Sequence, residues 1–241
     1  MASPFRSVLL DVEGTTSPIS FVYETLFPYA REHLGPFLDE HSSDPAVCSL
    51  FRELESTNLN DIPAGAPAVT GRDSIREITD YLLWLMDLDR KNPPLKSLQG
   101  LIWGQGFARG ELHSEVFADV PVCLRQWQEA GLRTAIYSSG SVLAQKMVFT
   151  YTAYGDLTNL ISGYFDTAVG AKKQPESYKR IAAELHLTAE QIIFVSDVAG
   201  ELEAAREAGL GTALSVRPGN SPQDNASQYR AIHSLADLFS S

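Results

Sequence analysis

The sequence predicts an α/β protein: a Rossmann-like three-layer core with a parallel sheet and an inserted α-helical cap. The predicted core comprises residues 1–18 and 119–241, and the predicted cap comprises 19–118. In the second part of the core, short apolar runs alternate with helical patterns, which is typical of βαβ units and a parallel sheet. One further apolar run stands alone near the N-terminus, separated from the others by the helical stretch.

The isolated run Val8-Leu9-Leu10 indicates a buried central strand, because such strands are covered on both faces and need not alternate. It ends at Asp11, and Glu13 and Gly14 follow closely. Open α/β sheets bind their ligands at the carboxyl ends of the strands. Two acids at that place can hold a hard cation and still offer an oxygen nucleophile. A solvated acidic turn is the alternative interpretation.

In the predicted cap, apolar residues recur three or four positions apart over 75–85, which predicts a helix with Asp73 or Ser74 as its N-cap. A second helical pattern covers 21–38, where Pro28 and Pro36 are expected to break it. Loops are expected at 60–71 and 91–94, where proline and glycine gather.

The second part of the core contains alternating elements that end in polar residues. We expect strands at 134–137, 192–195 and 212–216, and helices around 123–131, 178–185 and 201–208. In a parallel sheet, the residues that follow the strands meet at one edge. The first strand is therefore expected to join this sheet and to bring Asp11 close to Asp197.

These strand ends suit a site for phosphoryl transfer. Asp11 and Asp197 can ligate Mg²⁺ together with a main-chain carbonyl and waters. Ser138 and the amides after it suit a phosphate oxygen, and Lys172 can neutralise both phosphate and nucleophile. Glu201 can support the metal's shell or orient Lys172.

Taken singly, each of these residues has an ordinary structural interpretation. Lys172 can be a solvated charge, and its neighbour Lys173 can take the same role. Ser138 can cap a strand end, and Glu201 can be an acid favoured by a helix dipole. The ordered series on matching elements is what favours a catalytic site.

Composition narrows the classes of partner. The formal net charge of −11 disfavours a nucleic-acid partner, because there is no basic run to neutralise phosphates. No apolar run approaches a membrane span, so no membrane contact is expected. Cys48 and Cys123 are expected to be unpaired thiols in the cytoplasm, or also the nucleus in a eukaryote. The five histidines lack ligand spacing, which makes a zinc site improbable.

Four motifs resemble, in this order, those of the haloacid dehalogenase-like phosphohydrolases: Asp11-x-Glu-Gly-Thr, strand-end Ser138, Lys172 with Pro175, and Ser196-Asp197-x-x-x-Glu201. Within that superfamily, the chain is similar to the enolase-phosphatase, or acireductone synthase, family. The stretches that carry this closer resemblance are 11–22, 26–30, 98–103, 137–142 and 164–167.

The resemblance implies a haloacid dehalogenase-type core and a methionine-salvage enzyme. Such enzymes enolise 2,3-diketo-5-methylthiopentyl-1-phosphate, a small phosphorylated diketone, and remove its phosphate to give the acireductone. Carried over by residue, the metal positions for one Mg²⁺ per subunit are Asp11, Glu13 (through its main chain) and Asp197, and the substrate-binding positions are Ser138, Ser139 and Lys172. A monomer is expected.

The expected mechanism has Asp11 as nucleophile, Glu13 as general acid and then base, and Lys172 as a stabilising cation. The base for enolisation stays open between Glu13 and a cap residue such as Glu24. Phe21, Tyr23, Trp103 and Phe107 are candidates to pack the methylthio tail, although each suits an ordinary core. Alternatives are a phosphatase for another metabolite, a dehalogenase, and a catalytically silent binding module.

Overall fold

The structure is a computed structural model that describes residues 4–71, 74–90 and 92–239. The chain forms two compact units, Met1–Val22 with His113–Ser241, and Tyr23–Leu112. The assignment of these units as a catalytic core and a cap stays a prediction. Asp73, one of the two N-cap candidates, lies outside the described residues.

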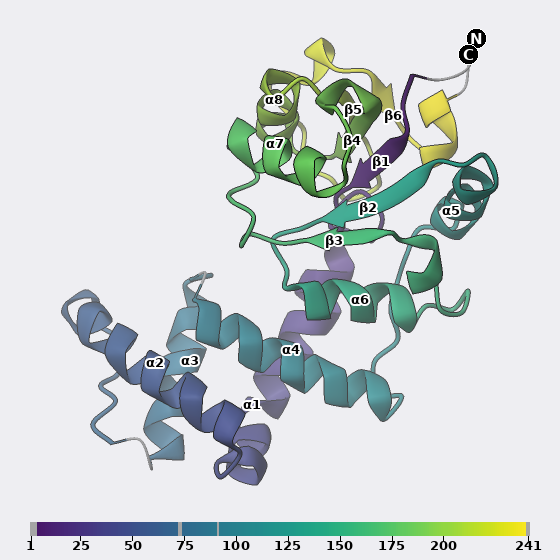
Figure 1. The fold of residues 1–241 in the computed structure, drawn as a ribbon. Helices are drawn as coiled ribbons and strands as arrows, with labels where there is room; N and C mark the ends of the chain where they lie inside the picture. The colour runs from purple at the N-terminus through teal and green to yellow at the C-terminus, as the bar shows by residue number, and fades with distance from the viewer. Residues whose placement is uncertain (1–3, 72–73, 91, 240–241) are drawn as a thin grey trace. The chain divides into compact units, whose positions relative to one another are not determined.

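The first unit is built on a parallel sheet (Figure 1). Its strands in the described part of the chain are β1 (Ser7–Leu10), β2 (Arg133–Tyr137), β3 (Gly163–Phe165), β4 (Ile192–Ser196), β5 (Gly211–Ser215) and β6 (Ala231–Ile232), in the order β3-β2-β1-β4-β5-β6. Leu10 in β1 pairs with Ile136 on one side and Val195 on the other. The isolated N-terminal run is therefore a central strand, and the α/β parallel-sheet prediction is confirmed.

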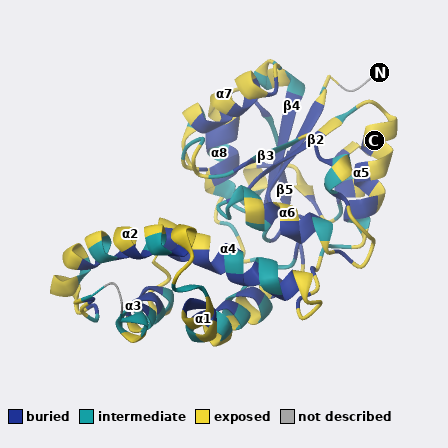
Figure 2. Ribbon diagram, turned by 60° about the horizontal axis from the view of Figure 1, so that its bottom comes forward, coloured by how far each residue is buried: buried dark blue, intermediate teal, exposed yellow. Residues whose placement is uncertain are grey.

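Helices cover both faces of this sheet. Helices α5 (Asp119–Glu129) and α6 (Val142–Thr150) lie on one face, and α7 (Pro175–Glu184) and α8 (Ala199–Glu207) lie on the other (Figure 1). This follows from right-handed crossovers, because the chain moves from β1 to β3 and then returns to β4 in the opposite direction. Between these layers, β1 and β4 are buried along their whole length, and Figure 2 draws β4 in the colour of buried residues.

The reversal of chain direction falls between β1 and β4. At such a switch point, the loops that follow the two strands diverge and leave a crevice where ligands bind. Asp11 follows β1 and Asp197 follows β4, while Ser138 follows the neighbouring strand β2. The topology therefore brings these three residues to one edge of the sheet, as the sequence predicted.

The second unit consists of helices α1 (Phe27–His41), α2 (Pro45–Asp61), α3 (Ile75–Asp87) and α4 (Pro93–Ala108), with a 3₁₀ turn at Ile62–Ala64. A π-helix, Phe21–Leu26, precedes α1 and crosses the boundary between the units. Ser74 is the N-cap of α3, and its side chain accepts a hydrogen bond from the Glu77 amide.

Three details of the helical prediction are wrong. Pro36 does not break α1, since the buried neighbours Leu34, Phe37 and Leu38 hold the helix through a single missing N–H. Pro28 lies in the first turn of α1, where an N–H is not needed. The expected loops are also shorter, because α2 continues to Asp61 and α4 already begins at Pro93.

Within the first unit, the chain segments that lead to and from the second unit are joined. The Phe117 amide donates to the Thr16 carbonyl over 3.0 Å, and the Ser17 hydroxyl donates to the Glu115 carbonyl over 2.7 Å. The exit and the return of the chain are therefore fixed side by side on the sheet unit.

Throughout the described ranges, the helices all lack the combination of length and apolar character that crossing a bilayer requires. Cys48 and Cys123 are free.

Candidate active site

Asp11 occupies the first position after β1, where it is buried. Its amide donates to the Val195 carbonyl over 3.0 Å, which continues the pairing with β4. Its Oδ1 accepts the Val12 amide over 2.8 Å. The loop that follows β1 therefore fixes the orientation of this carboxylate.

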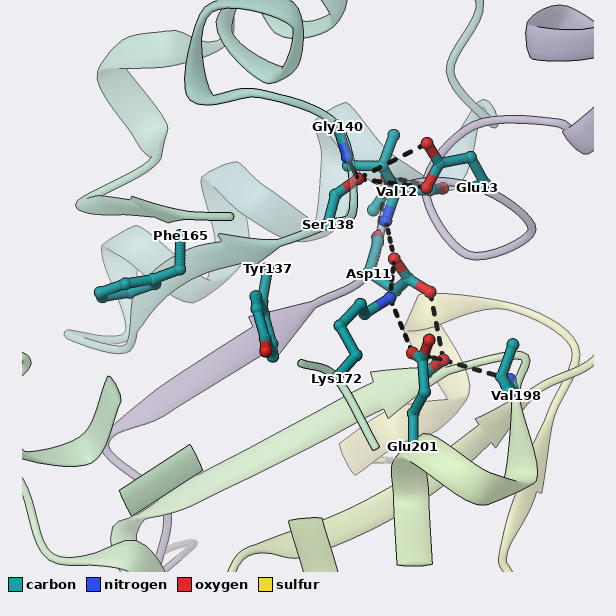
Figure 3. Close-up of polar contacts among 12 residues, drawn as sticks. Asp11, Val12, Glu13, Tyr137, Ser138, Gly140, Phe165, Lys172, Val198 and Glu201 are labelled. Carbon is teal, nitrogen blue, oxygen red and sulfur yellow. Dashed lines mark hydrogen bonds and ion pairs between the residues drawn. The ribbon is translucent and has the colours of Figure 1, made fainter. Parts of the chain in front are cut away.

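Lys172 lies between two carboxylates (Figure 3). Its Nζ is 2.6 Å from Asp11 Oδ1 and 2.7 Å from Glu201 Oε2. Burial would lower the pKa of Lys172, but the two carboxylates outweigh it and raise that pKa above its usual value. Lys173 is exposed, so of the two candidates it is Lys172 that turns into the site.

Ser196 completes this cluster, although sequence analysis gave it no role. Its hydroxyl lies 3.1 Å from Asp11 Oδ2 and 2.9 Å from Glu201 Oε2, and it accepts the Val198 amide over 3.1 Å. A hydroxyl has one proton, so it donates to one of the two carboxylates at a time. The sequence signals were its position at a strand end, directly before Asp197, and its place in the motif Ser196-Asp197-x-x-x-Glu201.

Ser138 and Glu13 form a second polar pair beside the first cluster (Figure 3). The Ser138 hydroxyl donates to Glu13 Oε2 over 3.2 Å and accepts the Gly140 amide over 3.0 Å. Ser139 is half-buried in the same turn. The predicted phosphate-binding turn is thus held next to the predicted acid–base.

The turn after β2 is held in place by Gln145, which sequence analysis also missed. From α6, its Nε2 donates to the Gly140 carbonyl over 2.9 Å and to the Phe165 carbonyl over 2.8 Å. The Phe165 carbonyl also accepts the Ser138 amide over 3.2 Å. Gln145 therefore connects the Ser138 turn to the end of β3.

Asp197 lies against the loop that follows β1. A Cβ on Gly14 would be 2.5 Å from Asp197 Oδ2, and Gly14 has a φ of +70°. Only glycine tolerates both the backbone conformation and this contact. The loop after β1 can therefore lie this close to the Asp197 carboxylate only because residue 14 is a glycine.

The carboxylates of the site lack a matching number of positive charges. Burial, followed by the charge of Asp11, raises the pKa of Asp197 to about 7 and that of Glu201 to about 7. The same causes, in the same order, raise the pKa of Glu13. The ammonium of Lys172 lies among these four acids, so one further cation would relieve the excess negative charge.

The donor set fits a hard divalent cation such as Mg²⁺, which prefers oxygen ligands and keeps several waters. Asp11 and Asp197 supply two buried carboxylates at one edge of the sheet. In the part of the chain that the structure describes, no three His, Cys, Asp or Glu side chains gather as a metal site.

The aromatic candidates for the methylthio tail divide into two groups. Phe21 is buried in the first unit, and Trp103 and Phe107 are buried in the second. Trp103 donates its indole N–H to the Leu26 carbonyl over 2.7 Å. Tyr23, in contrast, is 59% exposed. The three buried rings pack inside their units, and contact of any of them with the methylthio tail stays a prediction.

Known proteins share sequence and fold with this chain. Residues 5–209 match the haloacid dehalogenase-like hydrolase family. The chain is 46% identical over 232 residues to enolase-phosphatase E1 of Synechococcus elongatus, covering 96% of this chain and 97% of that protein. The crystal structure of the UTR4 protein of Saccharomyces cerevisiae is similar with a TM-score of 0.78 and 32% identity, covering 96% of this chain and 98% of that one.

A more distant solved structure shares the fold alone. It is the hydrolase YfnB of Bacillus subtilis, described as bound to magnesium, with a TM-score of 0.56 and 13% identity over 98% of this chain and 97% of that one. The match to enolase-phosphatase E1, in contrast, covers nearly the whole chain at high identity. The chain therefore belongs to the enolase-phosphatase E1 family of haloacid dehalogenase-like hydrolases.

Proposed function

We propose that this enzyme enolises 2,3-diketo-5-methylthiopentyl-1-phosphate and then hydrolyses its phosphate ester, which yields the acireductone of methionine salvage and inorganic phosphate. Membership of the enolase-phosphatase E1 family supports this reaction class. The observation that carries the phosphatase half is the buried cluster of Asp11, Lys172 and Glu201 beside the Ser138–Glu13 pair.

In the first half-reaction, a carboxylate oxygen of Asp11 attacks phosphorus, and the bond from phosphorus to the ester oxygen breaks. Glu13 donates a proton to the departing oxygen, a role that its raised pKa favours. Lys172 and the Ser138 hydroxyl stabilise negative charge on the phosphoryl oxygens. The products of this step are the enediol, which is the acireductone, and an aspartyl-phosphate on Asp11.

In the second half-reaction, water attacks the phosphorus of the aspartyl-phosphate, and its bond to Asp11 breaks. Glu13, now ionised, takes the proton of that water, so both carboxylates return to their starting states. General acid–base help of this kind contributes about 10²–10⁴ in rate. Dividing one displacement into two makes each of them easier.

We further propose that the enzyme holds one Mg²⁺ per subunit, through the Asp11 and Asp197 side chains and the main-chain carbonyl of Glu13. When bound, this cation supplies charge stabilisation at the phosphoryl group and polarises an oxygen of the diketone. Ser138, Ser139 and Lys172 bind the phosphate. The base for enolisation is Glu13 or a residue of the helical unit such as Glu24.

We also propose how the chain is divided into units and where it acts. Residues 19–118 form a cap that covers the site during catalysis, and 1–18 with 119–241 form the catalytic core. The enzyme acts as a monomer in the cytoplasm, or also in the nucleus if the source is a eukaryote. It engages neither nucleic acid nor membrane, in keeping with its net charge of −11.

The function is tested by supplying the diketone phosphate to the purified full chain with Mg²⁺. We expect phosphate release together with the ultraviolet absorption of the enediol product, and loss of both when a chelator is added. Phosphate release from other phosphate esters alone, without the enediol signal, would favour a phosphatase for another metabolite. Failure to hydrolyse any phosphoester would favour a silent binding module.

A further inference from the structure

Two adjacent hydroxyls at the start of α7 hold the backbone of the loop that carries Lys172. The Ser177 hydroxyl donates to the Ala171 carbonyl over 2.8 Å, and the Tyr178 hydroxyl donates to the Lys172 carbonyl over 2.6 Å. The second of these hydrogen bonds is buried. The carbonyl that Tyr178 fixes therefore belongs to the same residue whose ammonium lies between two carboxylates of the site.

The ring of Tyr178 is itself fixed by the core of the first unit. Tyr178 is wholly buried, and its ring centroid lies 5.5 Å from that of Tyr137 and 5.1 Å from that of Phe194. The planes of the two tyrosine rings meet at 82°, which is the edge-to-face arrangement that aromatic pairs prefer. The hydroxyl therefore acts from a rigid support, and the Lys172 carbonyl that it binds is held with it.

A third hydroxyl connects the same loop to the strand that leads to Ser138. Tyr137, the last residue of β2, donates its hydroxyl to the Gly170 carbonyl over 2.9 Å. Its ring lies beside Lys172, whose Nζ is 5.9 Å from the ring centroid (Figure 3). Gly170 has a φ of +138°, and a Cβ there would collide with the Ser177 hydroxyl. Three consecutive carbonyls, at positions 170, 171 and 172, are thus bound by hydroxyls from β2 and α7.

A buried hydroxyl needs a hydrogen-bond partner in any protein, and this need is the ordinary interpretation of the three bonds. In this loop, the choice of partners also has a consequence for the site. A lysine ammonium ends a flexible four-carbon stem, so a fixed backbone limits the positions that it can take. The Lys172 Nζ contacts Asp11 at 2.6 Å and Glu201 at 2.7 Å, and a shift of the Lys172 backbone would disturb both contacts.

We propose that Ser177 and Tyr178 are positioning residues that act through Lys172. Their hydroxyls hold the Lys172 backbone where its ammonium contacts both carboxylates and meets the phosphoryl oxygens. The proposal rests on the proposed function, in which Lys172 stabilises negative charge on those oxygens. Small displacements of a group that contacts the reacting atoms lower the rate strongly, because the reacting geometry is lost.

Acetylation of the full-length protein with acetic anhydride at low conversion tests this without turnover. Tandem mass spectrometry measures the labelling of Lys172 relative to Lys173, which is exposed and is the internal reference. In the wild type, we expect Lys172 to be protected. Loss of one hydrogen bond makes local opening of the loop about 2- to 10-fold more frequent. Tyr178→Phe and Ser177→Ala should each raise the relative labelling of Lys172 by about this factor.

Tyr81→Phe is the matched control, since Tyr81 is a buried tyrosine of the second unit whose hydroxyl donates to Asp61 Oδ2 over 2.7 Å. It loses a comparable hydrogen bond, which urea denaturation verifies, but should keep the wild-type labelling of Lys172 and the wild-type kcat/KM. In contrast, Tyr178→Phe should lower kcat/KM for phosphate release from the diketone phosphate by about 2- to 10-fold.

Wild-type labelling of Lys172 in either variant would show that the hydroxyl concerned does not hold Lys172. An equal rise in Tyr81→Phe would overturn the proposal, because the effect would then follow from stability alone. Rapid labelling of Lys172 in the wild type would overturn it as well. If the wild type releases no phosphate from the diketone phosphate, the proposed function fails, while the labelling still decides whether the hydroxyls position Lys172. Should Tyr178→Phe not fold, Ser177→Ala decides.

Discussion

Lys172 and Asp11 form a buried ion pair, in which 2.6 Å separate Nζ from Oδ1 and the side chains are 7% and 4% exposed. Glu201 shares the same ammonium at 2.7 Å. One cation thus compensates two buried carboxylates. Removing one partner of a buried pair is costly because the remaining charge stays in a medium of low polarity.

We predict that Lys172→Met lowers the free energy of unfolding by about 3–5 kcal/mol, because two carboxylates lose their counter-charge. Urea denaturation in the presence of a chelator measures this. The neighbouring Lys173→Met is the matched control, and it should be close to the wild type because Lys173 is exposed. Equal effects of the two substitutions would mean that the buried pair contributes nothing specific.

Asp11→Asn is predicted to abolish turnover and to leave the fold intact. An asparagine oxygen still accepts the Val12 amide or the Ser196 hydroxyl, but an amide is not a nucleophile toward phosphorus. Phosphate release measures turnover, and circular dichroism measures the fold. Acid-quenched mass spectrometry should show a phosphorylated wild-type protein and an unmodified variant. Sustained phosphate release by the variant would remove Asp11 from the role of nucleophile.

Gly14→Ala is predicted to lower both stability and turnover. A φ of +70° costs a residue with a Cβ about 1–2 kcal/mol, and the new methyl group would also displace the Asp197 carboxylate. Gly131→Ala separates these effects, since Gly131 has a φ of +77° but has open space around it. The control should lose a similar stability and keep its activity. If both variants keep full activity, close contact between Gly14 and Asp197 is not required.

Asp119→Asn is predicted to destabilise the protein in a pH-dependent way. Burial would raise the pKa of Asp119, but hydrogen bonds from Arg217 and the Leu235 amide outweigh it and lower that pKa. Arg217 Nη2 is 2.8 Å from Asp119 Oδ2. A lowered pKa stabilises the fold above the unfolded value of about 4, and this contribution is lost as the pH falls through the lower folded value.

The measurement is urea denaturation of the wild type and Asp119→Asn between pH 7 and about pH 3. The difference in unfolding free energy should be largest near neutrality and should shrink below about pH 4. Asp224→Asn, an exposed acid on the C-terminal segment, provides the control. A difference that stays constant over this range would show that the charge of Asp119 is not its source.

The central sheet was predictable because its longer strands are apolar runs that are followed by polar residues. The parallel arrangement then requires Asp11 and Asp197 to meet at one edge, whatever the distance between them in the chain. The strands β3 and β6 escaped prediction because they are only 3 and 2 residues long. Their pairing comes from neighbouring strands rather than from a pattern of their own.

The supporting residues of the site were not predictable in the same way. Ser196 contacts Asp11 across 185 positions, and Asn220 contacts Gly14 across 206. Short polar side chains in turns have ordinary local roles, and no spacing rule singles out the few that reach another loop. At Pro36 the local signal was misleading: proline predicts a helix break, but the buried neighbours keep α1 continuous.

Hydrogen bonds join the segments at which the chain leaves and re-enters the sheet unit, between Thr16 and Phe117 and between Ser17 and Glu115. The chain therefore returns to the sheet unit beside the point at which it leaves, whatever lies between these two segments. The inserted segment, Tyr23–Leu112, can therefore change in length or architecture over evolutionary time while the strand order stays the same. The two units can in this way change separately within one polypeptide.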